Sequence, residues 1–252
     1  MTTPTASLDT APAAPTKPAA LWEDFVDIFT QPRAVFERRR DGRYWPALLV
    51  LSALAAGLFF ATRPVIQPLI DRAMEAGLQQ QVASGKMTAE QAAQGRAMVE
   101  RFAGIGTVLS AVFGTPVLVF VSSALLWLGG RVAGARLTYP QAVTATTYAN
   151  VPRVLVGGVL GALVLGMTDP QRFSPLLQSA PLGPAFLLGA DASPIATAVA
   201  QSFDLTAVWA TVLAAIGAGV MARKGRPAWG AAAFAWGLAT LWALWQGFRA
   251  TL

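Results

Sequence analysis

The 252-residue sequence contains no cysteine and no histidine. Their absence excludes zinc sites built on those ligands, cysteine nucleophiles, haem attachment and every Ser-His or Cys-His catalytic arrangement. A paired-aspartate mechanism needs two carboxylates that face each other in the interior, and the sequence offers Asp204 no such partner. No phosphate-binding loop and no dinucleotide fingerprint is present. We therefore expect no enzyme activity, no metal and no cofactor.

Charged residues are also scarce, at 13% of the chain, whereas 54% of the residues are hydrophobic and the mean hydropathy is +0.50. This composition leaves too little polar surface for an ordinary soluble domain. The net charge of +6 raises the alternative of a nucleic-acid-binding protein. The basic residues flank apolar stretches instead of forming a basic domain, which favours membrane lipid as the partner and argues against nucleic acid.

Five apolar stretches dominate the chain, each close to or above the roughly 18 residues that signal a membrane-spanning helix. They cover residues 45–62, 104–129, 143–167, 205–222 and 229–248. The helices of a soluble all-α protein would show charged faces at intervals of about 3.6 residues, and these stretches do not. The sequence therefore predicts an all-α, polytopic membrane protein with five transmembrane helices.

The Lys and Arg residues crowd into alternate gaps between these stretches. The gap before the first stretch and the short loops 130–142 and 223–228 fall on one side, and the two loops contain no acidic residue. The positive-inside rule places this side in the cytoplasm, with the N-terminus cytoplasmic and the C-terminus outside. A sixth span within residues 185–202 would change this arrangement, but Asp191 and Pro194 argue against it.

The residues before the first span divide into a tail and a helical segment. Residues 1–20 are rich in Thr, Ala and Pro and are predicted to be disordered. Residues 21–43 carry apolar side chains at helical spacing and predict an amphipathic segment at the inner face, which either lies on lipid or packs against the spans. The side chains expected to contact anionic head groups or a protein partner are Trp22, Phe25, Phe29, Arg38, Arg39 and Arg40.

Two longer segments are expected on the outer side. Residues 63–103 are polar and rich in Gln and Ala, and they predict a helical hairpin that breaks near residues 84–88. Residues 168–204 contain five prolines, so this outer loop is not expected to form a continuous helix.

Arg153 lies ten residues after Val143, the start of the third stretch, and a charge at that depth marks function by default. The alternative is that Pro152 kinks the helix and the guanidinium either reaches cytoplasmic water or binds the freed carbonyls. Asn150 is a second polar residue in this stretch, and Asp204 lies at the edge of the fourth. The candidate functional site therefore consists of Asn150, Pro152, Arg153 and Asp204.

Two glycine pairs have the spacing that lets helix backbones approach closely. They are Gly157 with Gly161 in the third stretch and Gly130 with Gly134 after the second. Close packing within the chain explains them, and homodimerisation is the alternative.

Three segments carry a likeness to a known family: residues 22–36 (WEDFVDIFTQPRAVF), residues 148–152 (YANVP), and residues 203–209 (FDLTAVW) with the following basic turn and last stretch. Together they resemble the Yip1 domain family of five-span membrane proteins. This resemblance implies a non-enzymatic integral membrane protein. Eukaryotic relatives act in vesicle traffic with small GTPases, a role not carried over to this chain. The Ala-, Arg- and Trp-rich composition and short loops look more bacterial, which would place the chain in the cytoplasmic (inner) membrane.

Two hypotheses about function remain open at this point. The first is a membrane scaffold or adaptor, which uses the amphipathic segment and the Arg38–Arg40 cluster to engage lipid or an unknown protein partner. The second is a small permease or channel, which needs buried polar residues along a path. Only the threonines at 144, 146 and 147, with Asn150 and Arg153, fit that description.

Overall fold

The computed structural model describes residues 20–167, 182–188 and 192–249, and every regular element in these ranges is helical. Residues 1–19 of the predicted tail, and residues 168–181 and 189–191 of the predicted outer loop, lie outside the described residues. The elements are α1 (Leu21–Thr30), α2 (Pro32–Arg38), α3 (Trp45–Ala83), α4 (Ala89–Val132), α5 (Tyr139–Ala149), the π turn η1 (Arg153–Gly157), α6 (Gly158–Gly166), the 3-10 turn η3 (Pro184–Leu187), α8 (Pro194–Gln201), α9 (Leu205–Met221) and α10 (Trp229–Arg249).

Three of the described helical stretches are long and apolar enough to cross a membrane: Trp45–Ala83, Gly104–Val132 and Tyr139–Gly166. A fourth is added if α8 and α9, which meet at a 46° bend, count as one span. Apolar side chains such as Phe113 (55% exposed) and Leu163 (58% exposed) face outward, as they do in a helix surrounded by lipid. The predicted all-helical membrane fold is confirmed, with three or four spans by this measure where the sequence predicted five.

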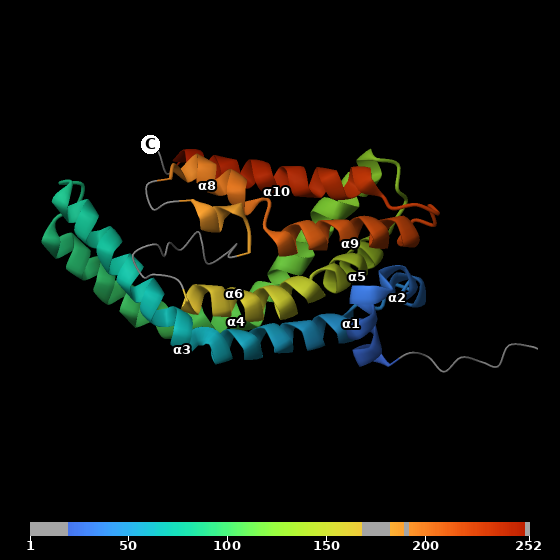
Figure 1. Cartoon of the computed structure of the whole chain (residues 1–252), viewed down its shortest axis with the longest axis horizontal. Helices are drawn as coiled ribbons and strands as arrows, with labels where there is room; N and C mark the ends of the chain where they lie inside the picture. The colour runs from blue at the N-terminus through green and yellow to red at the C-terminus, as the bar shows by residue number, and fades with distance from the viewer. Residues whose placement is uncertain (1–19, 168–181, 189–191, 250–252) are drawn as a thin grey trace, which may run out of the picture.

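Helices α3 and α4 form a long antiparallel pair whose far ends project beyond the rest of the bundle (Figure 1). Their 39 and 44 residues correspond to about 58 and 66 Å, well beyond the roughly 30 Å of a hydrocarbon core. The turn between them falls within residues 84–88. Gly85 has a φ of +71°, and the Thr88 hydroxyl caps α4 by accepting the Gln91 N–H at 3.1 Å. Much of both helices therefore lies outside the bilayer.

Helix α5 lies at the centre of the bundle and packs against α4 and α9. Its buried threonines are satisfied within the helix, because Thr144 donates to the Pro140 carbonyl at 3.0 Å and Thr147 to the Val143 carbonyl at 2.7 Å. At the crossing with α9, a Cβ added to Gly217 would lie 3.0 Å from the Ala145 Cβ, so the two helices approach closely.

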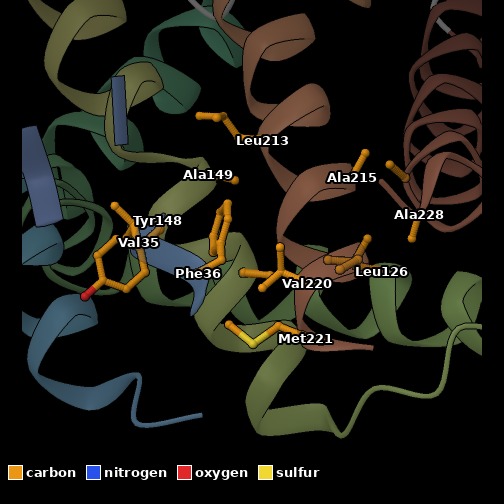
Figure 2. Close-up of a cluster of buried hydrophobic side chains, with 14 of the residues drawn as sticks. Val35, Phe36, Leu126, Tyr148, Ala149, Leu213, Ala215, Val220, Met221 and Ala228 are labelled. Carbon is orange, nitrogen blue, oxygen red and sulfur yellow. The ribbon is translucent and has the colours of Figure 1, made fainter. Parts of the chain in front are cut away.

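Helices α1 and α2 pack against the bundle, which is one of the two placements left open above. Phe25, Ile28, Val35 and Phe36 are buried in the same core as residues of α5 and α9. Figure 2 shows Phe36 between Tyr148 of α5 and Val220 of α9, and the Phe36 and Tyr148 rings meet edge to face at 6.5 Å. The apolar stripe of this segment is therefore largely used by the fold itself.

The three basic segments converge at the end of the bundle where α1 and α2 lie (Figure 1). Contacts between side chains and backbone carbonyls join them: Arg33 donates to Gly225 at 3.4 Å, Gln141 to Arg40 at 3.1 Å, and Lys224 to Ala133 at 3.3 Å. The residues before α3, the α4–α5 connection and the α9–α10 turn thus form one surface.

The glycine pairs singled out in the sequence have close neighbours in the same chain. A Cβ at Gly157 would lie 3.1 Å from the Thr206 Cγ2, and one at Gly130 would meet the Leu137 side chain. Gly161 lines a cavity, and Gly134 has a φ of +68°. Close packing and turn formation account for three of these four positions without a second copy of the chain.

Candidate functional site

The third apolar stretch changes its helical geometry at the residues predicted to form the site. Helix α5 ends at Ala149, and the Asn150 side-chain amide donates to the Thr146 carbonyl at 2.8 Å. Pro152 has no N–H to continue the α-helical pattern, and a π turn runs from Arg153 to Gly157 before α6 begins. Single π turns inside helices are frequent at functional sites because they reposition side chains.

Asp204 is 4% exposed and caps the first turn of α9. Its Oδ1 accepts hydrogen bonds from the Thr206 N–H at 2.9 Å and the Thr206 hydroxyl at 2.5 Å, and its Oδ2 accepts the Leu182 N–H at 3.0 Å. A carboxylate at a helix N-terminus is stabilised by these donors and by the helix dipole. The side chain therefore holds the start of α9 in place.

Arg153 and Asp204 line the same cavity, which has a volume of about 270 Å³ and lies between α3, α6 and the start of α9. No described carboxylate lies within 4.0 Å of the Arg153 guanidinium, so the two side chains share the cavity without forming an ion pair. Nothing in the sequence pairs these two residues, because 50 positions separate them along the chain.

Arg153 also lines a second cavity, of about 280 Å³, between α4, α5, α9 and α10. Asn150 and Trp236 line it too, as does Thr240, whose buried hydroxyl has no partner among the described residues. The predicted site is thus divided: Arg153 lies between two cavities, Asp204 faces one and Asn150 the other. Pro152 shapes the backbone and lines neither.

A second polar cluster, which the sequence did not single out, joins α1 and α2 to α5. Asp24 is fully buried, and its Oδ1 accepts from the Arg38 Nε at 3.0 Å and Nη2 at 2.8 Å. Its Oδ2 accepts from the Arg39 Nε at 2.6 Å and the Tyr148 hydroxyl at 3.3 Å. We call Asp24, Arg38, Arg39 and Tyr148 the Asp24 latch.

The charges of the Asp24 latch stabilise each other. Burial alone would lower the pKa of both arginines, but hydrogen bonds with Asp27 and Asp24 for Arg38, and with Asp24 for Arg39, outweigh it and raise both pKa values. Both guanidinium groups are therefore charged at any physiological pH. The signal available in the sequence was an acidic residue on the apolar face of α1, followed 14 residues later by two arginines.

The residues predicted to contact lipid or a partner have different surroundings. Arg38 and Arg39 belong to the Asp24 latch, and Phe25 is buried. Phe29 packs its ring against Trp209 at 5.5 Å. Trp22 is 67% exposed, and with Val26, at 58%, it forms an outward apolar pair on α1. Arg40 lines a hollow with other basic residues.

No group of three or more potential metal-binding side chains occurs among the described residues. The sequence matches the Yip1 domain over residues 26–247, which is most of the chain. A search of curated proteins and a search of solved structures found no match. The helical membrane-type architecture agrees with this family match. The chain therefore belongs to the Yip1 domain family.

Proposed function

We propose that this chain is a non-enzymatic membrane scaffold or adaptor whose basic end engages anionic lipid head groups and a protein partner at the cytoplasmic face. The observation that carries the proposal is that the basic segments and the latched α1–α2 pair form one surface. A fixed cationic surface attracts anionic lipids. The Yip1 domain family is not known as an enzyme family, which also supports a non-catalytic role.

The proposal includes five spans, with the N-terminus cytoplasmic and the C-terminus outside. Helix α9 has 17 residues and α10 has 21, which correspond to about 26 and 32 Å and approach the hydrocarbon thickness. The outward face of α10 is apolar, since Leu241 is 61% exposed and Trp242 is 62% exposed. These properties support counting both helices as spans.

Single cysteines test this topology, because the natural chain has none and gives no background labelling. A membrane-impermeant maleimide added to intact cells is expected to label Ser84→Cys and Arg249→Cys, whereas Arg136→Cys should react only after permeabilisation. Labelling of Arg249→Cys from the same side as Arg136→Cys would mean an even number of spans and would reject this part of the proposal.

A photo-crosslinking amino acid at Trp22 tests for a partner at the cytoplasmic end. Irradiation of native membranes should give a discrete protein adduct or a lipid adduct from this position. The matched control is the same amino acid at Gln80, which is exposed near the far end of α3. Adducts no more abundant from position 22 than from position 80 would contradict the scaffold role.

A small permease or channel is the second candidate, and one observation favours it: Arg153 separates two cavities inside the bundle. Of the threonines that suggested a polar path, Thr146 lines the second cavity. Thr144 and Thr147 line neither cavity, and their hydroxyls donate to carbonyls of their own helix. A path lined by arginine would select anions.

Flux measurements separate the two candidates. Purified protein in liposomes should leave chloride and phosphate permeability at the background of empty liposomes if the chain is a scaffold. If the chain is a channel, Arg153→Leu should abolish the flux, and Arg249→Leu, which removes an equal charge outside both cavities, should not.

A further inference from the structure

A hollow of about 300 Å³ lies at the basic end of the bundle, between the α2 segment, the end of α9 and the turn that joins α9 to α10. Half of its ten described lining residues are cationic, and none is acidic. The cationic residues come from two distant parts of the chain: Arg33, Arg40, Arg223, Lys224 and Arg226. Like charges gathered around one hollow repel each other, and an anion between them would offset this repulsion.

The positive charge of this hollow is only partly balanced by the protein. Arg33 pairs with Glu37 at 3.0 Å, and the Lys224 ammonium donates to a backbone carbonyl. Among the described residues, Arg40, Arg223 and Arg226 form no ion pair. The Arg40 Nε is buried and has no hydrogen-bond partner there. A buried N–H without an acceptor is costly, so an anion that reached the Arg40 guanidinium would satisfy this donor.

The backbone of the α9–α10 turn holds these side chains in a fixed arrangement. The Lys224 N–H bonds to the Gly219 carbonyl and the Arg223 N–H to the Val220 carbonyl, the two bonds of a Schellman cap at the end of α9. Arg223 occupies the left-handed position of this cap with a φ of +54°. Glycine is the residue that suits this position, so an arginine there costs backbone strain. Strained backbone positions cluster at binding and catalytic sites, so the strain at Arg223 motivates a binding role for its side chain.

We propose that this hollow is a binding site for one phosphate-bearing anion, held by Arg40, Arg223 and Arg226. Arginine forks match the oxygens of a phosphate and donate more than one charge-assisted hydrogen bond each. The anion is either the head group of an acidic phospholipid or a free phosphate. Binding of a lipid head group rests on the proposed function, because it requires the basic end to face the anionic leaflet. Binding of a free phosphate does not depend on that orientation.

The test uses the full-length protein extracted from phosphatidylcholine membranes that contain phosphatidylglycerol, with retained lipid counted by native mass spectrometry. Arg223→Gly should reduce retention of phosphatidylglycerol roughly tenfold, because it removes a charge-assisted contact. The same variant should melt at an equal or higher temperature, because glycine relieves the strain at this position. Weaker binding by a more stable protein cannot be explained by misfolding.

The matched control is Arg136→Ala, which removes the same charge from an exposed position on the same end of the bundle but outside the hollow. It should retain phosphatidylglycerol as the natural chain does. Equal losses from Arg223→Gly and Arg136→Ala would show diffuse attraction to the surface and overturn the site. Unchanged binding of both phosphatidylglycerol and inorganic phosphate by Arg223→Gly would overturn it as well.

Titration with inorganic phosphate identifies the source of the anion. Displacement of retained phosphatidylglycerol by phosphate would show that a free anion occupies the hollow, and retention against excess phosphate would show a lipid head group. Phosphate binding to the protein in detergent does not depend on orientation. Failure of the cysteine-labelling test would therefore reject the proposed topology and leave the anion site standing.

Discussion

Asp24→Asn is expected to lower the free energy of unfolding by about 2–3 kcal/mol. The substitution leaves two guanidinium groups facing a neutral amide in a position that is fully buried. The loss stays below that of a wholly buried ion pair, because the Arg38 and Arg39 side chains are 33% and 28% exposed and water screens part of their charge. Chemical denaturation of the purified protein in detergent micelles measures the change, and faster tryptic cleavage at residues 38–40 should accompany it.

Asp41→Asn is the matched control for the Asp24 latch. Asp41 pairs with Arg43 at 3.2 Å, but the two side chains are 52% and 85% exposed. An exposed pair contributes less than about 1 kcal/mol, so this variant should unfold almost as the natural chain does. Equal losses from the two aspartate variants would show that the latch contributes nothing beyond surface charge.

Phe36→Ala is expected to cost about 3–5 kcal/mol, the range measured when a buried phenylalanine is truncated. The side chain is fully buried between Tyr148 and Val220 (Figure 2). A Cβ at Gly217 would lie 3.0 Å from the Phe36 ring, so the glycine leaves the space that the ring occupies. Removal leaves a cavity that helices crossing at such close range cannot collapse. Thermal or chemical unfolding of the reconstituted protein measures the loss.

Phe113→Ala provides the comparison, since this phenylalanine is 55% exposed on α4. Truncation of this exposed side chain creates no internal cavity, so the free energy of unfolding of Phe113→Ala should differ from that of the natural chain by no more than about 0.5 kcal/mol. If α2 lay on the membrane surface instead of in the core, both phenylalanine variants would be equally mild, and the placement of α1 and α2 would be wrong.

The two results together would establish that the α1–α2 pair is part of the folded bundle. The proposed scaffold role depends on this, because a clamped pair presents Trp22 and Val26 at a fixed position. An ordered surface loses less conformational entropy when a partner binds than a mobile segment does.

Several local features were readable from the sequence because they depend on neighbouring residues. Gly85 and the Thr88–Gln91 capping box mark the turn between α3 and α4, where the sequence placed a break. The long apolar runs predicted helices in lipid, and three of them pass as spans on length and composition. The number of spans is harder to predict from the sequence than the presence of helices. Helix α9 is apolar enough for a span, but it has only 17 residues and follows a bend, so it counts as a span only together with α8.

Other features were not readable because they join residues far apart in the chain. Arg153 and Asp204 share a cavity only because α9 packs beside the π turn. Arg33 and Arg40 share a hollow with the basic α9–α10 turn only because α2 packs on α9. In the sequence these basic residues indicated only which side of the membrane is cytoplasmic. That they form a common surface is visible only in the three-dimensional structure.

The sequence by itself determined that this protein is helical, that it belongs in a membrane, and that it lacks the side chains of most catalytic sites. These conclusions follow from composition and periodicity, because whether a segment forms a helix in lipid depends on the residues of that segment alone. Only the tertiary structure decided that Asp24 is buried against two arginines and that five cations surround one hollow. Burial and charge pairing depend on which helix faces lie against each other, and this packing is determined by contacts among all the helices of the bundle.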